Sequence, residues 1–283
     1  MDKTIRGVND VITPGSTVLV LTGAGCSTAS GLGDYRNKQG LWKRAQPITG
    51  ETFRTDLGAR ARYWARSSVG WPQFSKAEPN QAHHALATLE ASGTVQNLVT
   101  QNVDELHQRA GHRSVIDLHG KLSTLSCVAC NTQQSRDRFQ QQLLDRNPWL
   151  ATLNASYAPD GDADLNTDAS VLHLIDHMHI PGCNKCGALM KPDVVFFGEN
   201  VPKDRVALAM QQLREVDVLL VAGSSLMVLS GFRFCRDAHQ RKQPIVILNQ
   251  GVTRADDIAT LRVSGDCGKL LTDLAATTGQ VGS

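Results

Sequence analysis

Four of the seven cysteines occur as two Cys-x-x-Cys pairs, Cys127 with Cys130 and Cys183 with Cys186. One such pair presents two thiolates to a single metal ion, and two pairs complete a tetrahedral Zn–S₄ shell. The interval between the pairs exceeds the roughly 15–20 residues of a regular ribbon, and four unrelated core thiols are the alternative. A shell of four cysteines leaves no position for water, so the predicted zinc is structural rather than catalytic.

Polar side chains that could act on a ligand follow three apolar, strand-like runs, at 95–100, 115–118 and 218–222. In open α/β sheets, ligands bind outside the carboxyl ends of the strands, so these three ends are expected to form one site. The candidates are Gln101, Asn102, Val103 and Asp104 after the first run, His119 after the second, and Gly223, Ser224 and Ser225 after the third.

His119 is the candidate general base, because imidazole titrates near neutral pH. A single histidine is also commonly a satisfied structural residue, so both interpretations stay open. His83, His84 and His107 fall on predicted helices, and we interpret them as structural.

A buried strand at 17–21 is followed closely by Gly23-Ala24-Gly25. Glycines at such a turn let the backbone approach a phosphate, and the N-terminus of a following helix favours an anion. A tight turn without a ligand is the alternative. The usual dinucleotide fingerprint is not met, because Thr28 occupies the third glycine position and no acidic residue ends a second strand about 20 residues later. The layout admits a nicotinamide dinucleotide but is unlike that of a hydride-transfer dehydrogenase.

The elements that must position these residues alternate between strands and helices. Continuous apolar runs predict strands at 17–21, 95–100, 115–118, 218–222 and 245–248, and helical spacing predicts helices at 81–92, 103–110, 203–215, 229–241 and 268–277. Such alternation indicates an α/β fold with a doubly wound, Rossmann-like parallel sheet. We assign 1–44, 76–120 and 191–283 to this large domain. A helical insertion at 45–75 and a zinc ribbon at 121–190 are expected to form a smaller lobe.

Composition excludes several classes of protein. The chain has 283 residues, of which 41% are hydrophobic and 20% charged, which is typical of a globular protein and not of a disordered or fibrous one. The net charge of +2 gives no general attraction to nucleic acid, so direct binding of nucleic acid is not expected. No apolar run reaches the roughly 18–20 residues that span a bilayer, and the N-terminus lacks an apolar signal segment. We therefore expect a cytoplasmic protein without a membrane partner, and a monomer in preference to an oligomer.

Taken together, the motifs resemble the sirtuins, which are NAD-dependent protein deacylases. The matching runs are GAGCSTASGLGDYR (23–36), TQNVDELHQRAG (100–111), LHG (118–120), both cysteine pairs, KPDVVFFGE (191–199), GSSLMV (223–228) and Asn249-Gln250-Gly251. Within the family the chain looks closest to class II, the branch with the mitochondrial lysine deacylase and ADP-ribosyltransferase. That closer resemblance includes RYWARSSVGWPQF (62–74), APDGD (158–162) and CGKLL near the C-terminus.

The resemblance implies a Rossmann-like lobe for NAD and a small lobe with a zinc ribbon, with NAD and an acyl-lysine peptide entering the cleft from opposite sides. It implies contacts with NAD from Gly23, Ala24, Gly25, Ser27, Asp34, Tyr35, Arg36, Gln101, Asn102, Val103, Asp104, Gly223, Ser224, Ser225, Asn249, Gln250, Gly251 and Cys267. It assigns the substrate backbone to Val195, Phe197 and Gly198, by strand addition. The implied catalytic residues are His119, Asn102 and Asp104.

The implied reaction transfers the acyl group of a lysine to ADP-ribose, releasing nicotinamide and O-acyl-ADP-ribose, with His119 taking a proton from a ribose hydroxyl. Mono-ADP-ribosylation of a protein at the same NAD site is the alternative. A zinc-ribbon binding protein with a vestigial pocket is a further reading, of a different class.

Two further features concern the choice of acyl group and the loop that carries Asp34 to Arg36. One sirtuin class uses a Tyr-x-x-Arg pair to bind acidic acyl groups, and Tyr63 with Arg66 matches that spacing. A solvated helix face with an aromatic stripe is the alternative. Gly33 replaces the proline that the family usually carries before the aspartate of the cofactor loop. A glycine there makes the loop more flexible in the unfolded chain, so its closure is expected to be less favourable.

Overall fold

The computed structural model describes residues 3–43, 47–153, 155–157, 163–165 and 168–278. The chain separates into two compact units, the first formed by Met1–Arg44, Glu78–His119 and Val201–Ser283, the second by Ala45–Ala77 and Gly120–Asn200. Residues 191–200 therefore lie in the second unit, and not with the large domain to which the sequence analysis assigned them. The reason is that strand β8 (Met190–Val194) pairs antiparallel with β4 (Gly120–Cys127).

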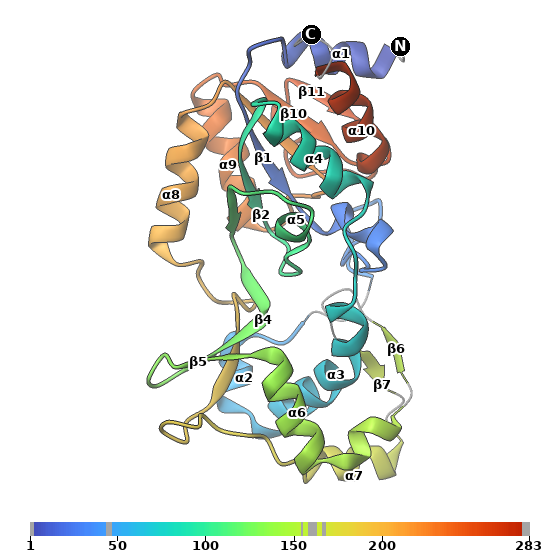
Figure 1. Ribbon diagram of the computed structural model, residues 1–283, viewed down its shortest axis with the longest axis vertical. Helices are drawn as coiled ribbons and strands as arrows, with labels where there is room; N and C mark the ends of the chain where they lie inside the picture. Colours follow the sequence, from blue (N-terminus) through green and yellow to red (C-terminus); the bar gives the residue numbers. More distant parts are fainter. Residues whose placement is uncertain (1–2, 44–46, 154, 158–162, 166–167, 279–283) are drawn as a thin grey trace. The chain divides into compact units, whose positions relative to one another are not determined.

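The first unit is built on one parallel sheet of six strands, in the order β11-β10-β9-β1-β2-β3 (Figure 1). Their bounds are β1 Val18–Thr22, β2 Val95–Thr100, β3 Val115–Asp117, β9 Val218–Ala222, β10 Ile245–Leu248 and β11 Leu261–Val263. All residues of β1, β9 and β10 are buried. This burial explains their uninterrupted apolar sequences, because a parallel strand is covered on both faces. The predicted α/β parallel sheet is confirmed.

Helices cover both faces of this sheet. They are α1 Lys3–Val11, α4 Gln81–Ala91, α5 Leu106–Arg109, α8 Lys203–Arg214, α9 Leu229–Gln240 and α10 Cys267–Thr278. Leu86 of α4 and Leu271 of α10 pack with Val20 of β1 in one hydrophobic core. Figure 1 shows α8 and α9 on the other side of the sheet from α4 and α10. Asn80 caps α4, because its side chain accepts a hydrogen bond from the Ala82 amide at 2.8 Å.

The strand order places a switch point at the centre of the sheet. β1 pairs with β2 on one edge and with β9 on the other, in register from Val18 opposite Val218 to Thr22 opposite Ala222. The turns that follow β1 and β9 therefore leave the sheet side by side. In open α/β sheets this is the place where a ligand binds.

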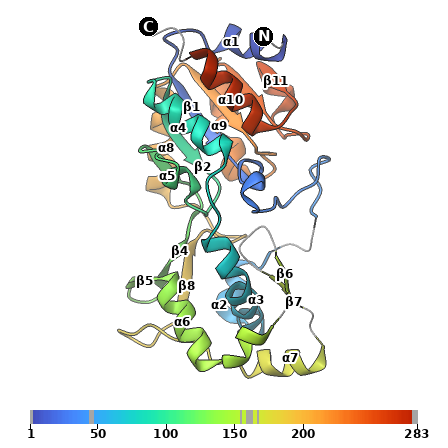
Figure 2. The same cartoon turned by 45° about the vertical axis from the view of Figure 1, so that its right-hand side comes forward.

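The second unit combines a small antiparallel sheet with helices. The sheet order is β5-β4-β8, with β5 at Gln133–Ser135, and the hairpin β6 (Ala155–Tyr157) with β7 (Ala163–Leu165) is separate. The helices are α2 Gly50–Thr55, α3 Leu57–Ser75, α6 Arg136–Arg146 and α7 Ala169–Asp176, and Figure 2 shows α6 beside α3. Trp64 and Phe139 pack in the core with ring centroids 4.6 Å apart. The APDGD motif (158–162) lies outside the described residues.

In the first unit, the structure differs from the sequence-based expectation at three places. The helix α1 and the short edge strand β11 were not predicted, because one is isolated before the first turn and the other has only three residues. No α-helix follows the glycine turn directly. The chain instead forms two 3₁₀ turns, η1 Ala24–Cys26 and η2 Thr28–Ser30, since Gly31 adopts a left-handed conformation (φ 82°) that ends the second turn. Within the described ranges, no helix has both the length and the apolar character needed to cross a membrane.

Candidate functional site

Two glycine turns meet at the switch point of the sheet. The Gly25 amide donates to the Gly223 carbonyl at 2.8 Å, and Gly223 has a left-handed φ of 60°. A Cβ atom at Gly223 would lie 2.4 Å from the Cys26 nitrogen, and one at Gly25 would lie 2.8 Å from the Gly223 oxygen. Neither position accepts a side chain, so the two turns meet with bare backbone at Gly25 and Gly223. Such a bare backbone can approach a phosphate closely.

Asn102, Asp104 and Ser27 form one hydrogen-bonded group beside this turn. The Asn102 amide nitrogen Nδ2 donates to the Gly23 carbonyl at 3.1 Å and to Ser27 Oγ at 3.0 Å. Ser27 Oγ in turn donates to Asp104 Oδ2 at 2.7 Å. Burial raises the pKa of Asp104, and hydrogen bonds from the Leu106 amide and Ser27 oppose this rise. The half-buried Val103 lies between Asn102 and Asp104 in the sequence.

Gln101 links the ends of β2 and β9. Its Nε2 atom donates to Ser224 Oγ at 2.7 Å and to the Thr22 carbonyl at 3.2 Å. Ser225, the next residue, uses its carbonyl to accept from the Arg254 amide at 2.9 Å. Polar residues from the ends of β2 and β9, two of the three ends that the sequence analysis assigned to one site, thus lie together.

His119 is held in a defined orientation by two hydrogen bonds. Its Nδ1 atom lies 2.9 Å from the Gln101 carbonyl, which only accepts, so Nδ1 carries the proton of the neutral ring. Nε2 is then the acceptor, and Ser230 Oγ, 2.8 Å away, donates to it. Burial lowers the pKa of His119, with a further contribution from the positive charge of Arg205, and the hydrogen bond to Gln101 opposes the shift. The imidazole therefore presents a neutral, basic Nε2 at neutral pH.

Ser230 was missed by the sequence analysis. It is the second residue of α9 and lies just beyond the GSSLMV run (223–228), which stops two residues before it. A serine after an apolar residue at a helix start carries no signal of contact with a histidine 111 residues earlier.

Asp34, Tyr35 and Arg36 lie in a loop of their own. Asp34 forms an ion pair with Lys43, and Arg36 places its guanidinium 4.1 Å from the ring centroid of Trp42. Arg36 Nη1 also donates to the Gly40 carbonyl at 2.7 Å, and the Tyr35 ring meets Trp42 edge-on at 6.2 Å.

The connection after β10 lies beside that loop. The Val252 amide donates to the Lys38 carbonyl at 3.0 Å, and a Cβ atom at Gly251 would lie 2.7 Å from the same oxygen. Asn249 Nδ2 donates to the Gly251 carbonyl at 2.8 Å, and the Gln250 carbonyl accepts from Ser264 Oγ at 3.3 Å.

Cys267, the first residue of α10, approaches the glycine turn from another direction. Its sulfur lies 3.4 Å from the Gly25 carbonyl and 3.9 Å from the Cys26 sulfur. The connection after β10 and the start of α10 thus both lie near residues that follow β1.

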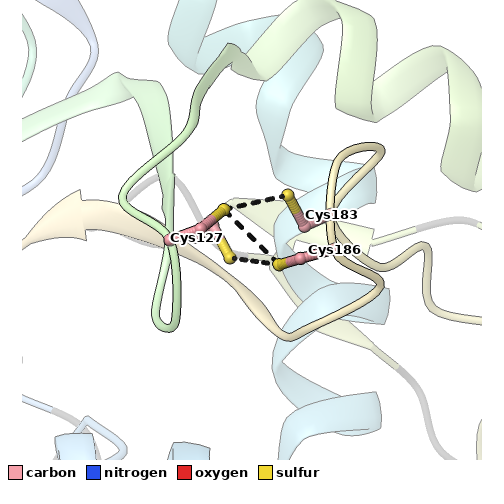
Figure 3. Close-up of side chains that lie close together, drawn as sticks. Cys127, Cys183 and Cys186 are labelled. Atoms are coloured by element: carbon pink, nitrogen blue, oxygen red, sulfur yellow. Dashed lines mark hydrogen bonds between the residues drawn. The ribbon is translucent and has the colours of Figure 1, made fainter.

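The four predicted metal ligands lie together in the second unit. The sulfurs of Cys127, Cys130, Cys183 and Cys186 are all within 4.8 Å of one another. Figure 3 shows Cys183 and Cys186 on one loop pointing toward Cys127. The distances between Cys127 and Cys186, Cys130 and Cys183, and Cys130 and Cys186 are 3.5, 3.7 and 3.4 Å. A tetrahedral ion with Zn–S bonds of about 2.3 Å needs sulfurs about 3.8 Å apart, so the four thiols fit that ion.

The remaining predicted residues also lie in the second unit. Val195, Phe197 and Gly198 follow β8, and Phe197 bridges Thr49 in parallel fashion. Tyr63 is buried on α3, with its ring 5.5 Å from that of Phe196. This packing makes the aromatic stripe of α3 part of the core.

A known family accounts for most of the chain. The model of the Sir2 family matches residues 23–230. The chain belongs to the Sir2 family. A Sir2 relative from Xanthomonas axonopodis pv. citri, named NAD-dependent protein deacetylase, is 52% identical over 95% of this chain and 90% of its own length. The protein named NAD-dependent protein lipoamidase sirtuin-4, mitochondrial, from Bos taurus is 44% identical over 94% of this chain and 84% of its own.

Solved Sir2 structures share the fold. One described as Sir2-p53 peptide-NAD+ superposes with a TM-score of 0.77 and 29% identity, covering 99% of this chain and 100% of that one. Another, described as a Sir2 homolog-NAD complex, has a TM-score of 0.73 and 30% identity, with coverage of 100% and 96%.

Proposed function

We propose that this Sir2 protein is an NAD-dependent protein deacetylase that removes acetyl groups from lysine side chains. The observation that carries the proposal is the oriented His119, whose Nδ1 is bonded to the carbonyl of Gln101, the residue before Asn102, so that Nε2 is basic. Asn102 and Asp104 are in turn linked through Ser27 beside the first glycine turn. The names of the similar proteins and the ligands of the similar solved structures support it.

In this proposal the two glycine turns hold the phosphates of NAD. The glycine backbone of these turns lets a phosphate come close, and the hydroxyls of Ser27 and Ser224 lie beside it. The Gly23 and Gly25 amides keep their bonds to the Ala222 and Gly223 carbonyls. Asn102 and Asp104 face the nicotinamide and its ribose, and their mutual link through Ser27 fixes both side chains.

The further contacts with NAD come from neighbouring connections. Gln101 and Val103 belong to the same strand end as Asn102, and Gly223 and Ser225 to the second glycine turn. Asn249, Gln250, Gly251 and Cys267 hold the adenosine half, and Asp34, Tyr35 and Arg36 belong to the loop that closes over the bound dinucleotide. Closure of that loop requires Arg36 and Asp34 to exchange their present partners.

The proton chemistry falls to His119. The acyl oxygen of the substrate displaces nicotinamide from the ribose carbon, and His119 Nε2 then takes a proton from a ribose hydroxyl, which makes that oxygen a nucleophile. The Gln101 carbonyl accepts the proton on Nδ1 and so fixes the tautomer, in which Nε2 carries no proton. Ser230 Oγ must turn away from Nε2, or keep only a shared contact, when the ribose arrives.

We further propose one structural Zn²⁺ on the four cysteines. The chain supports thiolates there, because the Ala129 amide donates to the Cys127 sulfur at 3.5 Å and the Lys185 amide to the Cys183 sulfur at 3.4 Å. Bound zinc supplies folding energy and no chemistry, since all four of its positions belong to protein.

The range of acyl groups is a finer proposal. We propose that the chain belongs to class II and also acts on larger or acidic acyl groups, with Tyr63 and Arg66 lining the acyl pocket. The 44% identity to a relative named as a mitochondrial lipoamidase supports an acyl range beyond acetyl. Bidentate pairing of a guanidinium with a carboxylate is the chemistry that would favour succinyl- or glutaryl-lysine.

Nicotinamide release across a panel of acyl-lysine peptides tests these proposals. We expect release with acetyl-lysine peptide, formation of O-acyl-ADP-ribose, and a loss of about 10²–10⁴-fold in His119→Tyr, because a positioned base contributes that much. Arg66→Ala should selectively slow the acidic acyl groups in the same panel. An ADP-ribose adduct on the protein product, found by mass spectrometry, would point to the transferase reaction, and full activity of His119→Tyr would show that another group is the base.

A further inference from the structure

A cluster of three charged side chains lies in the second unit, outside the sites described above. Lys191 Nζ is 3.1 Å from Glu199 Oε2, and Arg54 contacts Glu199 Oε1. The side chains of Lys191 and Glu199 are only 13% and 15% exposed, whereas that of Arg54 is 46% exposed. A largely buried carboxylate thus faces two cations.

This cluster is bonded to the backbone of the segment that follows β8. Lys191 Nζ donates to the Val194 carbonyl at 2.5 Å and to the Pro192 carbonyl at 3.3 Å. Glu199 Oε2 accepts from the Phe196 amide at 3.0 Å, while the Glu199 amide donates to the Phe196 carbonyl at 3.0 Å. Glu199 is therefore hydrogen-bonded to both the backbone amide and the backbone carbonyl of Phe196.

The turn that results has a fixed shape. Phe196 to Glu199 form a four-residue turn whose third residue, Gly198, has a φ of 81°. That conformation requires glycine or a residue of similar tolerance. In an extended chain, successive residues direct their backbone amide and carbonyl groups to opposite edges. The Val194 carbonyl and the Phe196 amide face the charged cluster, so the backbone amide and carbonyl of Val195 face the opposite edge.

The charges of the cluster depend on one another. Burial lowers the pKa of Lys191, and the carboxylate of Glu199 opposes this shift. The Lys191 ammonium also lies 4.7 Å from the ring centroid of Phe196. The Phe196 ring packs in the core against that of Phe53, with the two ring centroids 5.1 Å apart. Loss of the Glu199 charge leaves a buried ammonium without its close counter-ion, and such a change displaces the groups around it.

Gly50 makes room for the Glu199 carboxylate. A Cβ atom at Gly50 would lie 2.3 Å from Glu199 Oε1, which is far closer than any real contact. The Gly50 amide also donates to the Phe197 carbonyl at 3.0 Å. The first residue of α2 thus contacts both the carboxylate and the turn that this carboxylate holds.

We propose that Glu199, held by Lys191 and Arg54, is a positioning residue that sets the backbone of Val195 to Gly198 for pairing with the acyl-lysine peptide. It acts through the turn and touches no reacting atom. This inference rests on the proposed deacetylase function, in which the same segment takes up the substrate backbone.

Steady-state kinetics of Glu199→Gln provide the first test. The amide keeps an oxygen for the Phe196 amide but removes the charge that Lys191 and Arg54 need. We expect KM for the peptide to rise roughly tenfold, with kcat and KM for NAD within about threefold of wild type, because only peptide alignment is affected. Lys191→Arg, which keeps the positive charge, should stay closer to the wild-type KM than Lys191→Met.

Gly50→Ala tests the same inference without removing a charge. Its methyl group must push the flexible end of Glu199 aside, so the peptide KM should rise as in Glu199→Gln. Gly58→Ala in the same unit is the matched control, because its Cβ atom would lie 3.3 Å from the flexible end of the Arg62 side chain and at ordinary contact distance, 3.5 Å, from Asp56 Oδ1. That variant should keep the wild-type KM.

The outcomes separate the two levels of proposal. A wild-type protein that releases no nicotinamide with any acylated peptide overturns the proposed function itself. An active wild type whose Glu199→Gln and Gly50→Ala variants keep the peptide KM within twofold overturns the positioning role. The positioning role would also be overturned if the variants lost kcat only in proportion to their loss of folded protein and kept the wild-type KM. Such a result would show that Glu199 has a structural role only.

Discussion

At the scale of single residues, the hydrogen bonds of His119 define its chemistry. The Gln101 carbonyl can only accept, so it assigns the proton to Nδ1 and leaves Nε2 basic. Ser230 donates to that Nε2 atom at 2.8 Å and so stabilises the neutral ring. The same contact makes His119 a weaker base, because protonation of Nε2 requires the hydroxyl to turn away.

Ser230→Ala is therefore expected to shift the pH dependence of the reaction. Without the donor on Nε2, the pKa of His119 rises from its lowered position toward the ordinary value of about 6.5. The acid limb of kcat/KM should move to higher pH, while the rate at pH 8 changes by less than about threefold. Nicotinamide release measured from pH 5 to pH 9 reports the limb, and an unmoved limb would show that Ser230 does not affect the base.

At the scale of elements, the antiparallel pair β4 and β8 connects the four-cysteine cluster to the segment 195–198, which we propose binds the substrate backbone. Cys127 ends β4 and is paired with Met190, the first residue of β8. The chain then runs from Met190 through Lys191 to the turn at Phe196. An ion on the four cysteines holds the start of the strand whose other end carries the proposed peptide segment.

Cys183→Ser is expected to destabilise this unit selectively. Removal of one thiolate opens the four-sulfur shell, and structural zinc contributes folding free energy. Zinc content measured by a chelating dye should fall well below one per chain, with a lower melting temperature that added zinc does not restore. Cys235→Ser, on α9 of the first unit, is the matched control and should retain zinc. Full zinc content in Cys183→Ser would refute the assigned ligand set.

At the scale of the whole molecule, three buried histidines make stability depend on pH. Burial lowers the pKa of His83 to about 4, with a smaller contribution from His84, and burial also lowers the pKa values of His107 and His112. Because these groups bind protons more readily in the unfolded chain, where the pKa is about 6.5, the free energy of unfolding is largest above that pH and falls as pH drops below it.

His83→Gln should remove part of this dependence. Between pH 7.5 and pH 5, His83 alone is expected to cost about 2 kcal/mol of unfolding free energy. A glutamine at this position can still accept the Asn80 amide proton that His83 Nδ1 now accepts at 3.1 Å. Urea unfolding at both pH values measures the difference, with the exposed His239→Gln as control. Equal pH dependence in wild type and His83→Gln would contradict the shift.

Local patterns in the sequence determined much of this protein. Uninterrupted apolar runs predicted β9 and β10 with their observed bounds, because a strand buried on both faces is strongly enriched in apolar residues. The mixed run VQNLVT also predicted β2 with its observed bounds, although Gln96 in it is exposed. The Cys-x-x-Cys spacing predicted that Cys127, Cys130, Cys183 and Cys186 lie together, since two thiols at that spacing face one ion.

The tertiary structure alone decided the contacts between distant segments. The strand order β9-β1-β2 brought Gly223 against Gly25, and α9 delivered Ser230 to His119. In the other unit, packing placed Gly50 beside Glu199. A one-dimensional pattern reports periodicity and turn chemistry, which are local. Which segments then touch depends on the sum of many weak packing terms over the whole fold, and no single motif in the chain records that sum.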